Sequence, residues 1–199
     1  MVKTVVFDLG KVLVDFDYAI AARNLATGAE KSAAEIYRVI YDSPLLIAYE
    51  SARLTSRQFY DEARRATGFR GDFAEFSAAF ADIFSEIPAM IRLQAELRTA
   101  GVPTFVLSNT NEIAVEHIRR SFPFFGGFTG LVLSYEHAVM KPEPAIYRAA
   151  ESMSGCGGSE ILFIDDRLEN VEGAEKLGWR TVCHRSPGET IQLVRQMVS

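Results

Sequence analysis

The sequence predicts an α/β fold: a doubly wound parallel sheet with helices on both faces and a helical cap inserted after the first strand. Three observations lead to this prediction. Short β-branched and aromatic runs recur in the second half of the chain, helical patterns separate them, and about 95 residues with almost no strand signal follow the first run. A chain of 199 residues is long enough for one core domain with a modest insertion.

Five runs are typical of buried parallel strands. They cover residues 4–9, 104–107, 131–133, 161–164 and 181–183. Helical patterns between the later runs predict helices over residues 88–100, 112–120, 144–153 and 168–177. Gly101 and Gly178 each stand between a predicted helix and a predicted strand, as glycines that cap helix C-termini do. Strands and helices that alternate at this spacing predict a parallel sheet with helices on both faces.

The long interval after the first strand is rich in Ala, Phe, Tyr, Arg and Glu at helical spacing. It predicts helices over residues 18–27, 33–41, 56–67 and 72–84. Thr55 or Ser56 would cap the third of these helices, and Gly68 would end it. We therefore expect a core of residues 1–15 and 86–199 and a helical cap of residues 16–85. The cap would cover the carboxyl ends of the strands, where α/β sheets bind ligands.

Charge and composition narrow the range of partners. The chain has 21 Lys and Arg residues against 26 Asp and Glu residues, so no basic surface is expected for a nucleic acid or an anionic membrane. No apolar run approaches the ~18 residues needed to cross a bilayer. Asp8 interrupts the first apolar stretch, which argues against a signal peptide. The two cysteines are too few for a disulfide framework. These features predict a cytoplasmic protein, and they do not indicate its oligomeric state.

Four polar features follow predicted strands. They are Asp8, Ser108 with Asn109, Lys141, and Asp165 with Asp166. Each feature alone has an ordinary structural explanation, as a turn residue, a helix cap, a solvated lysine or a pair of loop carboxylates. Parallel strands carry their carboxyl ends to one edge of a sheet, so we expect the four features to lie close together.

Such a cluster favours metal-assisted phosphate chemistry. Neighbouring carboxylates repel one another unless a cation lies among them, and Mg²⁺ suits one or two carboxylates with a backbone oxygen and waters. A serine hydroxyl, the amides at a helix start and a lysine ammonium suit a phosphate group. An aspartate beside a metal-bound phosphate can act as a nucleophile and form an aspartyl phosphate.

Four sequence motifs resemble those of the haloacid dehalogenase superfamily of hydrolases, in its phosphatase branch with a small helical (C1-type) cap. The motifs are FDLGKV at residues 7–12, LSNT at 107–110, KP at 141–142 and IDDRLENV at 164–171. The cap stretch at residues 49–55 is similar to the Glu-x-Gly-x-Ile-Ser of this branch, with Ala52 in place of the glycine. Within the branch, the sequence is similar to bacterial phosphatases that act on α-glucose 1-phosphate.

The resemblance implies a Mg²⁺ site and a nucleophile. Asp8 would be both the nucleophile and a metal ligand, and the backbone carbonyl of Gly10 would be a second ligand. Asp166 would complete the protein ligands, while Asp165 would act through water or orient the site.

The resemblance also implies a phosphate site for a small phosphorylated metabolite. Ser108 and the Asn109 amide would hold the phosphoryl group, and Lys141 would balance the charge of the nucleophile and the phosphate.

One position departs from the pattern of this superfamily. Most of its phosphatases carry a second aspartate two residues after the nucleophile, as general acid and base, and here that residue is Gly10. Losing a positioned acid typically slows the reaction about 10²–10⁴-fold. Asp15 or Asp17, near the start of the cap, could replace it; otherwise the substrate has an easy leaving group or the phosphatase is slow.

Two other functions stay open at this stage. Because Gly10 lacks the acid, the chain could be a phosphate-binding module with little or no catalysis. A metal-free 2-haloacid dehalogenase also uses an aspartate nucleophile and lacks the second aspartate. Asp165 and Asp166 argue against the dehalogenase, because a metal-free site has no cation to balance their charge.

Overall fold

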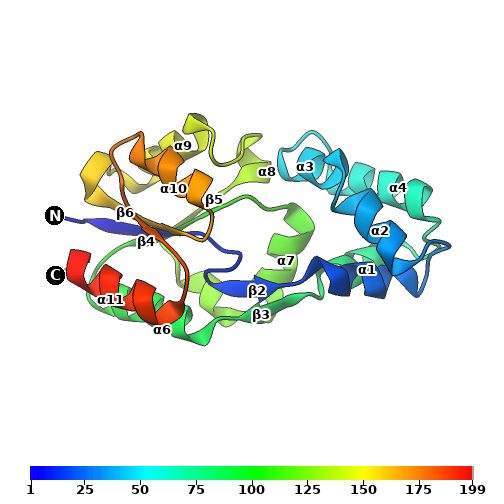
Figure 1. The fold of residues 1–199 in the computed structure, drawn as a ribbon, viewed down its shortest axis with the longest axis horizontal. Coiled ribbons are helices and arrows are strands. Elements are labelled where there is room, and N and C mark those ends of the chain that lie inside the picture. Colours follow the sequence, from blue (N-terminus) through cyan, green and yellow to red (C-terminus); the bar gives the residue numbers. More distant parts are fainter. Residues whose placement is uncertain (199) are drawn as a thin grey trace.

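The computed structural model describes residues 1–198 and contains a five-stranded parallel sheet between two layers of helices (Figure 1). The strand order is β5-β4-β1-β6-β7, and every neighbouring pair is parallel. The strands are β1 (Thr4–Phe7), β4 (Thr104–Ser108), β5 (Gly130–Leu133), β6 (Ile161–Asp165) and β7 (Arg180–Cys183). The predicted α/β class is therefore confirmed. Ser199, the last residue of the predicted core, lies outside the described residues.

Two apolar layers enclose the sheet. On one face, β1 contributes Val5 and Phe7 to a cluster with α6 (Pro88–Thr99), α7 (Glu112–Ser121) and α11 (Pro187–Val198). On the other face, Val6 packs with residues of α9 (Pro144–Ser154) and α10 (Leu168–Glu175). Successive strand residues point to opposite faces, so β1, covered on both sides, is apolar almost throughout. In Figure 1, α6 and α11 lie on one side of the sheet and α9 and α10 on the other.

Five helices, together with Ile113, form a separate apolar cluster beside the sheet (Figure 1). They are α1 (Tyr18–Ala26), α2 (Ala33–Ile40), α3 (Pro44–Glu50), α4 (Ser56–Thr67) and α5 (Phe73–Ala81). Thr55 caps α4 with a reciprocal capping box, and Gly68 ends it in a left-handed conformation with φ of 70°. The helix predicted over residues 72–84 ends earlier, at Ala81, because residues 84–86 form a strand.

A two-stranded antiparallel ribbon joins the sheet layer to these helices. It pairs β2 (Val14–Phe16) with β3 (Phe84–Glu86), two strands that the sequence pattern did not predict. The predicted domain boundaries at 15/16 and 85/86 fall within this ribbon, and the division into core and cap stays a prediction. Helices α3, α8 (Ser134–His137) and α11 are further elements that were not predicted.

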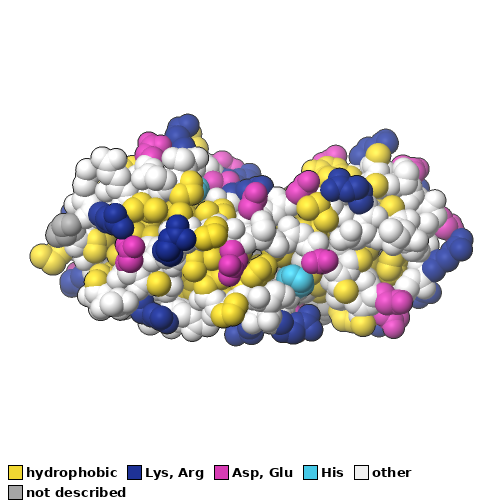
Figure 2. Space-filling view, turned by 90° about the horizontal axis from the view of Figure 1, so that it is seen from below, with side chains coloured by type: hydrophobic (Ala, Val, Ile, Leu, Met, Phe, Trp, Pro, Cys, Tyr) yellow, Lys and Arg dark blue, Asp and Glu magenta, His cyan; other side chains and the backbone are white. Residues whose placement is uncertain are grey.

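The surface agrees with the balanced composition. Figure 2 shows one face of the molecule, on which Lys and Arg side chains are dispersed among acidic and apolar groups. In the part of the chain that the structure describes, no helix has the length and apolar character needed to cross a membrane.

Candidate active site

The acidic residues that follow β1 and end β6 meet at the carboxyl edge of the sheet. One carboxylate oxygen from each of Asp8, Asp165 and Asp166 lies within 4.8 Å of the other two. The ammonium of Lys141 joins them: its Nζ is 2.9 Å from Asp8 Oδ1 and 2.6 Å from Asp165 Oδ2. Because β1 and β6 are adjacent and in register, residues more than 150 positions apart come into contact.

Asp165 is fully buried and directs its carboxylate at protein groups. It accepts hydrogen bonds from Lys141 Nζ at 2.6 Å, from the Arg167 amide at 2.9 Å and from Asn170 Nδ2 at 3.0 and 3.1 Å. Asp8 and Asp166, by contrast, line an open crevice. This difference makes Asp165 the residue that holds Lys141 in place.

Lys141 is not the solvated lysine that its position before a proline would ordinarily indicate. It is 5% exposed, and its ammonium also donates to the carbonyl of Leu107 at 2.9 Å. Burial acts against the charged form, but the Asp8 and Asp165 carboxylates outweigh burial and raise the pKa of Lys141 above its ordinary value. The lysine is therefore a permanent buried cation at neutral pH.

The cluster carries more negative than positive charge. Burial raises the pKa of Asp8 to about 7, and the neighbouring carboxylates add to the effect while Lys141 opposes it. Burial and the charge of Asp165 also raise the pKa of Asp166. Three carboxylates face one ammonium, so a divalent cation between Asp8 and Asp166 would neutralise the site. The donor set is all oxygen, which fits Mg²⁺.

Ser108 and Asn109 lie at the end of β4 beside this cluster. Asn109 holds the Lys141 backbone at both sides: its Nδ2 donates to the Lys141 carbonyl at 3.0 Å, and its Oδ1 accepts from the Lys141 amide at 2.7 Å. Asn111, not Ser108 or Asn109, caps α7, by accepting a hydrogen bond from the Ala114 amide. The interpretation of Ser108 and Asn109 as a plain helix start is therefore wrong.

The crevice above Asp8 is small and is closed partly by the helical cluster. Its volume is about 140 Å³, and a space of about 50 Å³ adjoins it. Both spaces share the same five lining residues: Gly10, Phe16, Tyr18, Glu50 and Asn109. Ser108 lines only the smaller space.

The carboxylates expected to replace the missing acid point elsewhere. Asp15 is exposed and bonds to Lys11 Nζ at 2.5 Å, and that hydrogen bond keeps the pKa of Asp15 below its ordinary value. Asp17 caps α1 by accepting from the Ala19 amide. Neither residue lines the crevice, so the expectation that Asp15 acts as a catalytic acid lacks structural support.

Glu50, the last residue of α3, is the site residue that the sequence analysis missed. Its side chain is buried and lines both spaces. Burial raises the pKa of Glu50 to about 7, although a hydrogen bond from Asn111 and the charge of Arg167 act in the opposite direction. The stretch at residues 49–55 contained the signal, because Glu50 stands at the glutamate of the Glu-x-Gly-x-Ile-Ser pattern, but the pattern alone did not indicate a role for it.

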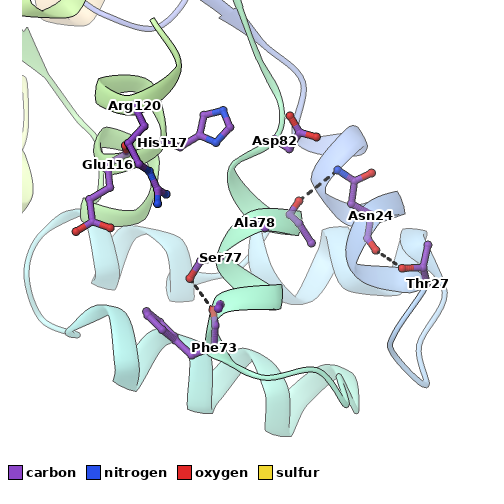
Figure 3. A pocket seen from close by; sticks show the side chains of 11 residues that line it. Asn24, Thr27, Phe73, Ser77, Ala78, Asp82, Glu116, His117 and Arg120 are labelled. Atoms are coloured by element: carbon purple, nitrogen blue, oxygen red, sulfur yellow. Dashed lines mark hydrogen bonds between the residues drawn. The ribbon is translucent and has the colours of Figure 1, made fainter.

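A larger hollow of about 710 Å³ lies between α1, α5 and α7, away from the acidic cluster (Figure 3). Its polar groups are bonded to nearby backbone: Asn24 Nδ2 to the Ala79 carbonyl, and the hydroxyls of Thr27 and Ser77 to carbonyls one turn earlier (Figure 3). His117 and Arg120 of α7 border the hollow without converging on one point (Figure 3). This surface is a junction between helices, and none of Asp8, Lys141, Asp165 and Asp166 lines it.

A parallel sheet with an aspartate after its central strand, an acidic pair at the end of the adjacent strand and a buried lysine beside them places the chain in the class of α/β hydrolases. The chain belongs to the haloacid dehalogenase-like hydrolase family, whose sequence profile matches residues 2–178.

Several members of this family resemble the chain over nearly its whole length. It is 26% identical over 188 residues to D-ribitol-5-phosphate phosphatase of Bacteroides thetaiotaomicron, which covers 91% of each protein. A predicted HAD-like hydrolase of Porphyromonas gingivalis superposes with a TM-score of 0.85 at 26% identity, covering 100% of this chain and 98% of that one. A HAD family enzyme of B. thetaiotaomicron in complex with magnesium and inorganic phosphate gives 0.81 at 25% identity, with coverage of 93% and 95%.

A shorter match has higher identity. Over 54 residues the chain is 44% identical to Enolase-phosphatase E1 of Streptomyces avermitilis, a stretch that makes up 27% of this chain and only 23% of that protein. The relatives thus include phosphatases, and the chain is a hydrolase of their family.

Proposed function

We propose that this protein is a Mg²⁺-dependent phosphatase that hydrolyses a small phosphorylated metabolite through an aspartyl-phosphate intermediate. The observation that carries the proposal is the cluster of Asp8, Asp165 and Asp166 around the buried Lys141. We further propose that it acts in the cytoplasm, as its two-cysteine composition led us to expect.

Asp8 and Asp166, with the backbone carbonyl of Gly10, would hold the Mg²⁺. The excess negative charge of the cluster supports this role, as does the magnesium and phosphate complex of the B. thetaiotaomicron enzyme. When bound, Mg²⁺ would offset negative charge on the phosphoryl oxygens and on the nucleophile.

The other steps of the reaction would depend on side chains and backbone groups of the protein. A carboxylate oxygen of Asp8 attacks the phosphorus, the bond from phosphorus to the leaving oxygen breaks, and water later hydrolyses the aspartyl phosphate. Lys141, held 2.9 Å from Asp8, balances the charge of the nucleophile and the incoming phosphate. Ser108 and the Asn109 amide would bind phosphoryl oxygens, in keeping with their place at the end of β4.

The size and lining of the crevice favour a small substrate. A volume of about 140 Å³ accommodates a phosphoryl group and a short carbon skeleton, and Phe16, Tyr18 and Asn109 offer both apolar and polar contacts. A sugar or polyol phosphate fits this description, and D-ribitol-5-phosphate phosphatase is among the relatives.

A phosphate-binding module without catalysis is the second candidate. It is favoured by one observation: Gly10 has no acidic side chain, and neither Asp15 nor Asp17 lines the crevice. The metal-free dehalogenase is disfavoured, because three carboxylates and one ammonium would remain unbalanced without a cation.

Hydrolysis of p-nitrophenyl phosphate tests the proposal. We expect turnover with Mg²⁺ and none with EDTA, and we expect the Asp8→Asn variant to be inactive. The matched control Asp15→Asn alters an exposed carboxylate and should keep wild-type activity. If a wide panel of phosphate esters is not hydrolysed although phosphate binds, the protein is a binding module. If chloride is released from a 2-haloacid in EDTA, it is a dehalogenase.

A further inference from the structure

Resting on the phosphatase function proposed above, we propose that Glu50, carried into the crevice by α3, is the general acid and base of the reaction and performs the role for which Gly10 has no side chain. No motif of the sequence assigns this role to Glu50.

Glu50 shares its space with the nucleophile. It lines the crevice together with Asp8, Lys141 and Asp166, although it belongs to α3 and not to the sheet layer. It also lines the adjoining space between Gly10 and Ser108. A substrate whose phosphorus faces Asp8 would therefore place its leaving group among the residues around Glu50.

The backbone at Glu50 is fixed to the sheet layer, as a positioned acid requires. The carbonyl of Glu50 accepts a hydrogen bond from Ser134 Oγ at 2.7 Å, and the same serine bonds to Thr110 near the end of β4. One residue earlier, Tyr49 Oη accepts from the Ile113 amide at 3.1 Å. Two adjacent residues of α3 are thus tied to the loop and helix that border the site.

The other groups that line the crevice are poorly suited to donate this proton. Its carboxyl groups are Asp8, Asp166 and Glu50, and the first two are the proposed metal ligands. Tyr18 is almost completely enclosed, and burial raises the pKa of its phenol far above the ordinary value. Asp15, outside the crevice, is held by Lys11.

The protonation behaviour of Glu50 is consistent with this assignment. Burial raises the pKa of Glu50 to about 7, the direction that favours the protonated form of a general acid. The groups that face it are Asn111, Arg167 and Asp8, of which the first two favour the carboxylate and the third favours the acid.

In each turnover Glu50 gives up one proton and regains one. As Asp8 attacks the phosphorus and the bond to the ester oxygen breaks, the Glu50 carboxyl group gives its proton to that oxygen, and the alcohol leaves. The Glu50 carboxylate next takes a proton from a water molecule, whose oxygen attacks the phosphorus of the aspartyl phosphate. The bond between phosphorus and Asp8 breaks, which releases inorganic phosphate and restores the Asp8 carboxylate and the Glu50 acid.

The Glu50→Gln variant tests the proposal, because leaving groups differ in their need for a proton. An alkyl phosphate needs protonation of a poor leaving group, so we expect its first turnover to slow about 10²–10⁴-fold. p-Nitrophenolate leaves without a proton, so its first turnover should stay within about tenfold of wild type. The later turnovers should slow, because hydrolysis of the aspartyl phosphate needs Glu50 as the base. The progress curve should then show a burst of one nitrophenol per enzyme.

The control is Glu112→Gln. Glu112 accepts a hydrogen bond from Ser56 where α4 meets α7, but it does not line the crevice. Its replacement should therefore change the turnover of both substrates by the same factor and produce no burst. If Glu50→Gln instead raises KM equally for both substrates without a burst, Glu50 only binds substrate and the inference is wrong. A wild-type protein that is inactive on both esters would overturn the phosphatase function and this inference with it. An active wild type whose kinetics Glu50→Gln leaves unchanged would overturn the inference alone.

Discussion

Gly10 and Phe16 are packed against each other where the chain leaves the sheet. A Cβ atom at Gly10 would lie 2.7 Å from Phe16 Cε1, closer than carbon atoms tolerate. The Phe16 ring is itself held by Tyr18, with ring centroids 4.9 Å apart, and by Phe84 at 6.0 Å. The ring therefore fills the space that a side chain at Gly10 would need.

We predict that Gly10→Ala destabilises the protein by about 1–3 kcal/mol through overpacking. In a Phe16→Leu background the same change should cost less, with a coupling of about 0.5–3 kcal/mol in a double-mutant cycle measured by urea denaturation. Gly126→Ala is the control, because its Cβ would meet no atom within 4 Å. Equal losses for Gly10→Ala in both backgrounds would show that Phe16 is not the obstacle.

The sequence predicted one half of the site better than the other. Asp8, Lys141, Asp165 and Asp166 follow strands, and the geometry of parallel strands is enough to bring them together. Glu50 and Phe16 depend on long-range packing instead. Phe16 lies in the β2–β3 ribbon, which pairs residues about 70 positions apart, and Glu50 lies in α3, which contacts the sheet layer through Ser134. Neither contact produces a periodic pattern in the sequence.

At the scale of elements, strand and helix alternation in the sheet layer was predictable, because each element there buries a long apolar face. The ribbon strands β2 and β3 have three residues each, and polar residues interrupt both of them. Strands this short are stabilised by each other and carry no signal alone. Helix α3 did carry a signal, since Ser43 caps it and Pro44 occupies its first turn.

A small set of hydrogen bonds joins α3 and α4 to the start of α7. Tyr49 Oη is 2.6 Å from Ser56 Oγ and accepts from the Ile113 amide, one of the amides at the start of α7 that has no partner within the helix. Ser56 also donates to Glu112. These contacts connect α3 and α4 of the helical cluster to α7.

We predict that Tyr49→Phe costs about 1–3 kcal/mol, because the Ile113 amide is left without its partner. Hydrogen exchange should quicken in α3 and in the first turn of α7. Tyr60→Phe is the matched control: its hydroxyl donates to the Gly71 carbonyl within the helical cluster, so exchange should quicken only near Gly71. Identical exchange patterns in the two variants would contradict the role of Tyr49 as a link to α7.

For the whole molecule, the surplus of negative charge links the stability of the fold to the binding of a cation. The net charge is −5, and part of the surplus is concentrated where Asp8, Asp165 and Asp166 meet a single lysine. Bringing these carboxylates together opposes folding, and a bound cation removes the penalty.

We therefore predict that Mg²⁺ stabilises the folded protein. At a free concentration 100 times the Kd, the gain would be about 2.7 kcal/mol, or roughly 5–10 °C in Tm. Thermal unfolding monitored by circular dichroism would measure it. Asp166→Asn should abolish the shift and Asp15→Asn should leave it intact. A shift of the same size in Asp166→Asn would mean that the ion binds elsewhere.

The contact between Gly10 and Phe16 also limits how this protein can change during evolution. An aspartate at position 10, of the kind most phosphatases of the superfamily carry, would bring its Cβ to the same 2.7 Å from the ring, so a smaller residue in place of Phe16 would make that change less costly. That replacement would itself remove aromatic packing from the ribbon. The cost of a side chain at position 10 therefore depends on the residue at position 16, which makes the two positions epistatic.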